Sequence, residues 1–360
     1  MNATRQLHDL GQSLWLDNIT RGILDDGTLE QHIEAYSLTG LTSNPTIFDK
    51  AISGTEIYDN AIREKARQGK SGETLFVELA LEDLRRAAKL FKPVHDSTHG
   101  VDGWVSMEVS PLLASDTAAT IEAAASIHHQ AACDNLFVKI PGTPEGVPAI
   151  EESIFAGVPV NVTLLFSSEQ YQAVAEAYMR GIERRIEAGL NPKVASVASV
   201  FISRWDVAVK NDVPEDMHNK LGIAIAGRVY RAYLDVLASE RWQKLAKAGA
   251  QAQRLLWAST GTKDPKAPDT LYVTSLAAPD TINTMPGKTI EALADHGGLH
   301  GSMSTDSSEA ETMLKRFVDA GVDIDALAHK LQVDGAASFV KSWKDLLDHI
   351  AEQSKALSEG

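Results

Sequence analysis

The chain has 360 residues, 44% of them hydrophobic, and its 34 basic and 49 acidic side chains give a formal net charge of −15 at pH 7. This acidic balance argues against non-specific binding to nucleic acid or to an anionic membrane surface, so an anionic substrate would need a local basic pocket. A single cysteine, Cys133, excludes an internal disulfide and any metal site built from several cysteines.

Eight short apolar runs of strand length follow one another along the chain, with helical patterns between them. The runs cover Ser13–Asp17, Leu38–Ser43, Gly103–Glu108, Leu136–Ile140, Pro159–Leu165, Val194–Phe201, Arg254–Ala258 and Leu271–Ser275. Apolar residues recur at helical spacing from Phe76 to Phe91, from Val174 to Ile186 and from Phe339 to Ile350. The last of these segments predicts a C-terminal amphipathic helix.

The alternation of strands and helices predicts the fold class. Strands separated by helices pair in parallel, because a parallel neighbour needs a crossover of a dozen or more residues. Eight such units predict an α/β fold, a (β/α)8 TIM barrel, in which residues 44–102 and 202–253 form helical insertions or elongated crossovers. A doubly wound open sheet is the alternative fold, but no Gly-x-Gly-x-x-Gly pattern follows an early run.

Nothing in the chain predicts a second domain or a membrane segment. No low-complexity stretch or flexible linker interrupts the sequence, so we expect one barrel domain over residues 1–360. The first residues lack the apolar core of a secretory signal, and no apolar span is long enough to cross a bilayer. We therefore expect a cytoplasmic protein without a membrane partner.

Polar residues close most of the apolar runs. In a barrel of this kind the chemistry gathers at the carboxyl ends of the strands, so these residues are expected to face a shared pocket. Each one alone has a structural alternative, such as a helix cap, a turn residue or an exposed strand end. The set, in chain order, comprises Asp17, Asn44, Glu108, Lys139, Asn161, Thr163, Ser199, Arg204, Ser259 and Lys263.

Lys139 is the most informative member of this set, because it interrupts the apolar run Leu136–Ile140 just before a Pro-Gly turn. An ionised lysine is rarely buried without a partner, whereas a desolvated lysine loses its proton and becomes a nucleophile toward carbonyl carbon. The alternative is a strand-end lysine whose stem packs and whose ammonium reaches water. The neighbouring polar strand ends favour the nucleophile.

Other polar patterns predict neither a metal nor a cofactor. Gly69-Lys70-Ser71 resembles the end of a phosphate-binding loop, but no apolar strand precedes it. The pairs His95/His99 and His128/His129 have no acidic or cysteine partner to complete a metal site. We expect chemistry through side chains alone, because imine formation activates a carbonyl without a metal.

The sequence resembles the transaldolase family over most of its length. The matching stretches are Leu16-Asp17, Thr42-Ser43-Asn44-Pro45-Thr46-Ile47-Phe48, Val105-Ser106-Met107-Glu108-Val109, Val138-Lys139-Ile140-Pro141, Asn161-Val162-Thr163-Leu164 and Asp280-Thr281-Ile282-Asn283-Thr284-Met285-Pro286. The resemblance implies transfer of a dihydroxyacetone unit from a ketose phosphate to an aldose phosphate in the pentose phosphate pathway. The donors would be sedoheptulose 7-phosphate or fructose 6-phosphate, and the acceptors glyceraldehyde 3-phosphate or erythrose 4-phosphate.

The resemblance also implies roles for the strand-end residues. Lys139 would form the Schiff base, and Asp17 would remove the C4 hydroxyl proton. Glu108 and Thr163 would relay protons through a water. Asn44, Asn161 and Ser199 would hold the dihydroxyacetone hydroxyls.

Binding of the substrate phosphate is expected at Arg204, with Ser259 and Lys263 completing the site. Here the chain departs from the family pattern, in which an arginine lies two residues after the serine. This sequence has Gly261 there and Lys263 slightly later. Lys263 is either the substitute for that arginine or a solvated loop lysine.

Two other functions remain open from sequence. The first is a fructose-6-phosphate aldolase that releases free dihydroxyacetone. Related aldolases are expected to have a tyrosine where this chain has Phe201, so the apolar ring favours transfer. The second is a non-catalytic barrel that binds sugar phosphates, but such a protein would be expected to have lost Lys139, Asp17 or Glu108. Also open is whether burial or a carboxylate deprotonates Lys139.

Overall fold

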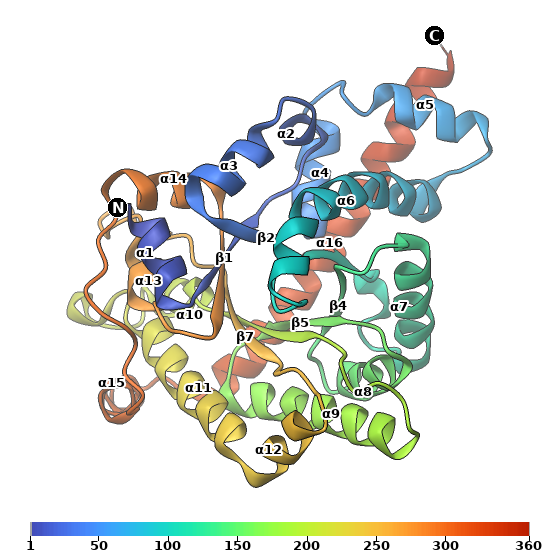
Figure 1. Cartoon of the computed structure of the whole chain (residues 1–360). Coiled ribbons are helices and arrows are strands. Elements are labelled where there is room, and N and C mark those ends of the chain that lie inside the picture. Colours follow the sequence, from blue (N-terminus) through green and yellow to red (C-terminus); the bar gives the residue numbers. More distant parts are fainter. Residues whose placement is uncertain (1, 360) are drawn as a thin grey trace.

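The computed structural model describes residues 2–359 and contains a closed ring of eight strands with helices around it, which confirms the (β/α)8 barrel (Figure 1). All neighbouring strands pair in parallel, in the order β2-β1-β8-β7-β6-β5-β4-β3. The strands are β1 (Ser13–Asp17), β2 (Leu38–Thr42), β3 (Val105–Glu108), β4 (Leu136–Pro141), β5 (Val160–Leu165), β6 (Ser196–Phe201), β7 (Arg254–Ala258) and β8 (Thr281–Met285).

The ring closes between β2 and β3 through a short contact. Gly40 and Trp104 form an isolated parallel bridge, and the Leu41 N–H donates to the Trp104 carbonyl oxygen over 3.0 Å. A Cβ atom on Gly40 would lie 2.7 Å from that same oxygen and 2.7 Å from the Trp15 ring. Only glycine permits this approach, so Gly40 is required for closure of the barrel.

Helices follow the strands and cover the outside of the barrel. The predicted segment from Phe76 to Phe91 lies in α6, and that from Val174 to Ile186 lies in α9. The α-helices are α1 (Ala3–Leu10), α2 (Arg21–Asp25), α3 (Thr28–Tyr36), α4 (Pro45–Ser53), α5 (Asp59–Arg67), α6 (Gly72–Ser97), α7 (Thr117–Ala131), α8 (Gly146–Ala156), α9 (Ser168–Glu187), α10 (Ser203–Val209), α11 (Leu221–Ala238), α12 (Glu240–Lys247), α13 (Leu271–Ser275), α14 (Gly287–His296), α15 (Ser308–Asp319) and α16 (Ile324–Glu359), and two 3₁₀ turns are η1 (Pro111–Leu113) and η2 (Glu215–Met217).

The predicted eighth strand was wrong. Leu271–Ser275 forms the helix α13, in which the Leu276 N–H donates to the Tyr272 carbonyl oxygen. A short apolar run fits a strand and a buried helical turn equally well, so its periodicity could not separate them. The true eighth strand, Thr281–Met285, is fully buried although it carries Thr281, Asn283 and Thr284. These polar residues weakened its apolar signal.

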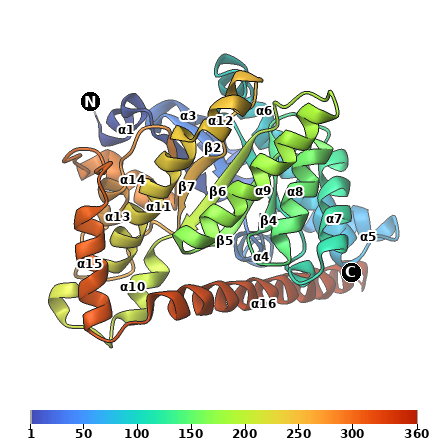
Figure 2. The same ribbon diagram turned by 90° about the horizontal axis from the view of Figure 1, so that it is seen from below.

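The C-terminal helix is longer than predicted and crosses one end of the barrel. α16 begins at Ile324 and runs for 36 residues, and Figure 2 shows it passing across the barrel beside α4 and α10. Gln332 fastens it there, because its Nε2 donates to the Gly142 and Leu164 carbonyl oxygens over 3.0 Å each. Gly142 and Leu164 lie at the carboxyl ends of β4 and β5, so α16 covers the end where a barrel carries its chemistry.

Gly335 allows α16 to approach the barrel closely. A Cβ atom at this position would lie 2.9 Å from Leu164 Cδ2 and 3.0 Å from Arg204 Nη1. Phe339 and Trp343, one and two turns further along α16, are buried, with 6% and 1% of their surfaces exposed. In residues 2–359, no helix combines the length and apolarity that a membrane span requires.

Candidate active site

A cavity of about 140 Å³ opens at the carboxyl ends of the strands, beneath α16. Its lining comes from strands β1, β2 and β4 to β8, from the segments that follow β2, β7 and β8, and from α10 and α16. Parallel strands bring their carboxyl ends to the same edge, so residues far apart in the chain meet here. It brings together nine of the eleven predicted site residues: Asp17, Asn44, Lys139, Thr163, Ser199, Phe201, Arg204, Ser259 and Lys263. Glu108 and Asn161 reach this group through hydrogen bonds.

Lys139 is buried, with 6% of its surface exposed. Its Nζ donates to the Ser43 carbonyl oxygen at 2.9 Å and lies 3.5 Å from Glu108 Oε2. Glu108 is opposite Lys139 in the β3–β4 register, so the strand pairing itself sets the two side chains together. The ammonium therefore does not reach bulk water, and a carboxylate stands within reach of its proton.

Glu108 is suited to exchange protons. Its side chain is 4% exposed, and this burial raises the pKa of its carboxyl above the usual range, while the neighbouring Lys139 charge opposes the rise. The Asp17 charge raises the pKa of Glu108 further. A carboxyl with a raised pKa can accept the Lys139 proton and return one later, which an ordinary exposed glutamate would do poorly at neutral pH.

Asp17 ends β1 on the other side of the lysine. Burial raises the pKa of Asp17, and a hydrogen bond from Thr42 Oγ1 to Asp17 Oδ1, 2.7 Å long, opposes that rise. The positive charges of Lys139 and Lys263 oppose it as well. Thr42 in turn shares a 2.7 Å hydrogen bond with Thr284 of β8. Asp17 is thus held in place and partly stabilised in its charged form.

The variant Thr42→Val should move the acid limb of the pH–rate profile to higher pH. Losing the Thr42 hydrogen bond removes a contact that favours the Asp17 carboxylate, so the pKa of Asp17 rises further. Because a base must be ionised, activity will then be lost at a higher pH as pH falls. The measurement is kcat/KM against pH. Thr284→Val is the matched control, since it leaves the Thr42–Asp17 bond in place; an equal shift in both variants contradicts the prediction.

Amides and hydroxyls form the floor of the cavity. Ser199 Oγ donates to Asn161 Oδ1 at 2.7 Å, and Asn161 Nδ2 donates to Ser106 Oγ at 3.2 Å. Asn161 is fully buried and lies behind Ser199. Asn44 uses Oδ1 to cap α4, accepting from the Ile47 N–H at 3.0 Å, which leaves its amide donors for a ligand. Thr163 Oγ1 has no hydrogen-bond partner among the described residues and is itself buried.

Two cations face the cavity from its outer side. Arg204 lies over the Phe201 ring at 5.0 Å and near the Phe339 ring at 5.8 Å, and within residues 2–359 no carboxylate perturbs it. Burial lowers the pKa of Arg204, yet a guanidinium keeps its charge at neutral pH. Lys263 is exposed and close enough to Asp17 to lower the pKa of that carboxyl. Ser259 sits in the left-handed region, with its Oγ 2.9 Å from Ser203 Oγ.

Sequence reasoning missed Thr42, Thr284 and Phe339, which also line the cavity. Thr42 and Thr284 stand in the motifs quoted above, and their position at a strand end was the signal that could have identified them. No local signal marked Phe339. It lies in the predicted C-terminal helix, and nothing in the sequence indicated that this helix packs against the barrel. In the described residues 2–359, no group of three or more His, Cys, Asp or Glu could hold a metal.

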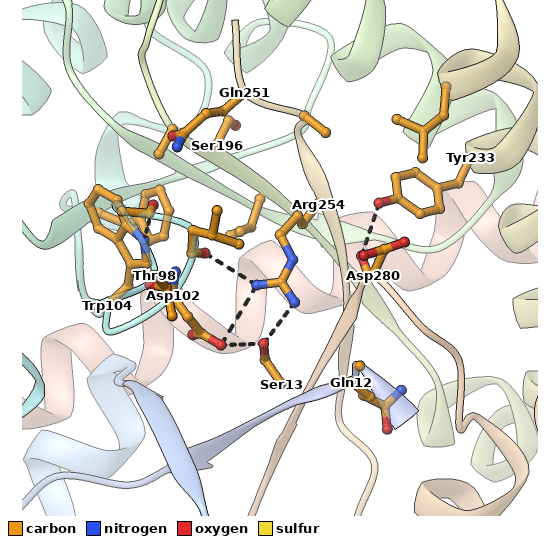
Figure 3. Close-up of a pocket in the computed structure, with 18 of the residues that line it drawn as sticks. Gln12, Ser13, Thr98, Asp102, Trp104, Ser196, Tyr233, Gln251, Arg254 and Asp280 are labelled. Carbon is orange, nitrogen blue, oxygen red and sulfur yellow. Dashed lines mark hydrogen bonds and ion pairs between the residues drawn. The ribbon is translucent and has the colours of Figure 1, made fainter. Parts of the chain in front are cut away.

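A larger cavity of about 640 Å³ lies at the opposite end of the barrel (Figure 3). Its wall includes Ser13 and Arg254, the first residues of β1 and β7, so it is at the amino ends of the strands. Arg254 Nη2 donates to Ser13 Oγ at 2.7 Å, and Nη1 lies 3.9 Å from Asp102 Oδ2. The cation here is satisfied by the protein, whereas Arg204 at the carboxyl end has no such partner.

Comparisons with known proteins agree with this geometry. The sequence profile of the family described as Transaldolase/Fructose-6-phosphate aldolase matches residues 14–350. A protein named Transaldolase from Thermobifida fusca (strain YX) is 43% identical over 361 residues, covering 98% of both chains. One named Transaldolase 2 from Nostoc punctiforme (strain ATCC 29133 / PCC 73102) is 39% identical over 377 residues, covering 99% of both. One named Transaldolase from Parafrankia sp. (strain EAN1pec) is 43% identical over 362 residues, covering 97% of this chain and 98% of the other.

Proposed function

The chain belongs to the transaldolase/fructose-6-phosphate aldolase family and acts as a transaldolase, and we propose that a Schiff base on Lys139 carries its chemistry. One observation carries this proposal. The Lys139 amine is buried 3.5 Å from the Glu108 carboxylate, beside a cavity that also holds Asp17 and Arg204. A buried amine beside a proton-accepting carboxylate is the arrangement that imine formation requires.

The reaction begins with a proton transfer. Lys139 gives a proton to Glu108, whose raised pKa reduces the free-energy cost of that transfer. The neutral amine adds to the C2 carbonyl of the ketose phosphate. Glu108 protonates the C2 oxygen, takes a second proton from the attacking nitrogen and passes it to the same oxygen, which leaves as water, and a positively charged imine remains on Lys139. Thr163, whose hydroxyl is unpaired in this cavity, supports the same relay.

The imine makes cleavage of the C3–C4 bond possible. Asp17 removes the C4 hydroxyl proton, the C3–C4 electron pair moves to the imine nitrogen, and the first aldose phosphate departs. The three-carbon enamine stays bound, with Asn44 and Ser199 placed to hold its hydroxyls and Asn161 orienting Ser199. An acceptor aldose phosphate then takes the enamine, and hydrolysis returns Lys139 as the free amine.

Transfer is favoured over release of free dihydroxyacetone. Phe201 is 8% exposed, lines the cavity and packs 5.4 Å from the Phe166 ring, centroid to centroid. An aromatic ring without a hydroxyl offers no group to activate water next to the enamine. The enamine therefore survives until the acceptor arrives.

The donors are sedoheptulose 7-phosphate and fructose 6-phosphate, and the acceptors are glyceraldehyde 3-phosphate and erythrose 4-phosphate. This reaction belongs to the pentose phosphate pathway. We propose a cytoplasmic location, because the charged phosphates of these sugars prevent them from crossing a bilayer unaided. The chain needs no cofactor for this chemistry.

Incubation with fructose 6-phosphate followed by borohydride reduction tests the function. The expected product is a reduced three-carbon adduct, located by mass spectrometry on Lys139. Adding erythrose 4-phosphate should then produce sedoheptulose 7-phosphate faster than free dihydroxyacetone appears. Absence of any adduct would exclude the Schiff base, and faster release than transfer would make the enzyme an aldolase.

Arg204→Ala should raise KM for phosphorylated donors with a smaller effect on kcat. Hydrogen bonds to a charged group contribute about 1.5–3 kcal/mol, which corresponds to a factor of roughly 10 to 150 in KM. The measurement is KM for fructose 6-phosphate, with unphosphorylated fructose as the comparison substrate. The variant should discriminate less between fructose 6-phosphate and fructose. An equal rise in KM for both substrates would contradict a role of Arg204 in phosphate binding. Lys263→Ala should show a weaker form of the same effect, because Lys263 is exposed.

A further inference from the structure

A second cavity reaches Glu108 from outside the catalytic one. It has a volume of about 250 Å³, and its lining includes four buried residues, Glu108, Ser110, Ile127 and Trp343, which are 4%, 4%, 6% and 1% exposed. Its outer rim includes the exposed residues Ser126 and Gln130 of α7. The cavity therefore extends from the exposed side of α7 to Glu108, the residue whose carboxylate contacts Lys139.

Polar side chains line this cavity from several elements. They are Glu73 and Thr74 of α6, Glu108 at the end of β3, and Ser126 and Gln130 of α7. A polar cavity of sufficient size holds water, whereas an apolar one stays empty. A volume of about 250 Å³ is several times what one water needs. The second cavity is thus roomy and polar enough to hold a chain of waters that ends at Glu108.

The catalytic mouth offers a poor route for water while substrate is bound. Phe339 and Arg204 line the catalytic cavity 5.8 Å apart, and the phosphate of a bound donor is expected at Arg204, where it would stand in the path of water. Trp343 lies one turn after Phe339 on α16, so the same helix borders both cavities. Glu108 stands between them, contacting Lys139 and lining the second cavity.

We propose that the second cavity is a water channel, through which Glu108 exchanges water and protons with the solvent while the sugar occupies the catalytic mouth. This inference rests on the proposed function. When the carbinolamine collapses, the C2–O bond breaks, Glu108 supplies a proton, and the oxygen leaves as water into the channel. On hydrolysis a water from the channel adds to C2 and gives a proton to Glu108. Glu108 passes that proton to the nitrogen, the C2–N bond breaks as the C2 hydroxyl loses its proton to Glu108 and the carbonyl re-forms, and the amine is released.

The test uses fructose 6-phosphate labelled with ¹⁸O at C2. Imine formation releases the ¹⁸O label as water. A cycle of imine formation and hydrolysis therefore replaces the label only if that water escapes to the solvent before it adds back to C2. Ala123 of α7 lines the channel, so Ala123→Leu should plug it, and Ser126→Leu should narrow its rim. Ala125→Leu, on the exposed side of the same helix, is the matched control. Loss of label is followed by mass spectrometry, and borohydride trapping on Lys139 measures imine occupancy in the same samples.

In Ala123→Leu we expect the loss of label to slow by about fivefold or more, because water exchange is the step that the channel serves. The amount of trapped imine should stay within about twofold of that in the parent enzyme, because imine formation is a separate step. Ser126→Leu should change in the same direction, and Ala125→Leu should match the parent enzyme. Label loss that is unchanged, or that falls only in parallel with imine occupancy, would overturn the channel. Absence of trapped imine in the parent enzyme would instead overturn the Schiff-base proposal, so the two failures are distinguishable.

Discussion

The substitution Lys139→Ala is expected to abolish transfer activity, with a fall in kcat of roughly 10⁵-fold or more, as for the loss of other covalent nucleophiles. Without the amine no imine forms, so the C3–C4 bond has no electron sink. The nearby Glu108 and Asp17 remain but have no covalent intermediate to act on. The measurement is the coupled transfer assay together with borohydride trapping, which should yield no adduct.

Lys263→Ala is the matched control for this result, because the cavity is lined by two lysines and only Lys139 is buried. This variant should retain the three-carbon adduct and most of kcat. Thermal unfolding of both variants checks that the barrel is intact. If Lys139→Ala still accumulates an adduct, or if Lys263→Ala loses it, the nucleophile has been assigned to the wrong lysine.

Asp17→Asn is expected to lower kcat by about 10²- to 10⁴-fold, the usual effect of removing a general base. The amide can still accept the Thr42 hydrogen bond, so the position of the side chain should be preserved. Imine formation needs no base at C4 and should continue. The trapped adduct should therefore change from the three-carbon unit to the whole six-carbon sugar phosphate, which mass spectrometry distinguishes directly.

The variant Glu108→Gln distinguishes the role of Glu108 from that of Asp17. Because Glu108 exchanges protons with Lys139, its loss should reduce the amount of every adduct rather than change the size of the adduct. A three-carbon adduct in Asp17→Asn, formed as fast as in the parent enzyme, would show that another group removes the C4 proton.

Much of the architecture could be predicted because its signals are local. The bounds of β1 and β7 agree with the predicted runs, those of β2 to β6 differ from them by at most two residues at an end, and the predicted eighth strand is replaced by β8. The replaced strand shows the limit of this reasoning. In β8 three polar residues are buried, and each has a hydrogen-bond partner from another strand or loop; Thr260 Oγ1, for example, donates to Asn283 Oδ1 at 2.8 Å. A local apolar pattern cannot register partners that lie elsewhere in the chain.

The sequence by itself determined the alternation of strands and helices, and with it a barrel whose strand ends gather Asp17, Lys139 and their neighbours at one edge. That follows from periodicity and from the geometry of parallel pairing, which involve residues close along the chain or in adjacent strands. Only the tertiary structure decided that α16 lies over the mouth, that Phe339 lines the catalytic cavity and that Glu108 borders a second one. Those arrangements depend on contacts between segments far apart in the chain, such as Gln332 with Gly142, 190 residues apart, and Thr46 with Ser342, 296 residues apart. Side-chain shape and hydrogen bonding decide such contacts, and no local pattern records them.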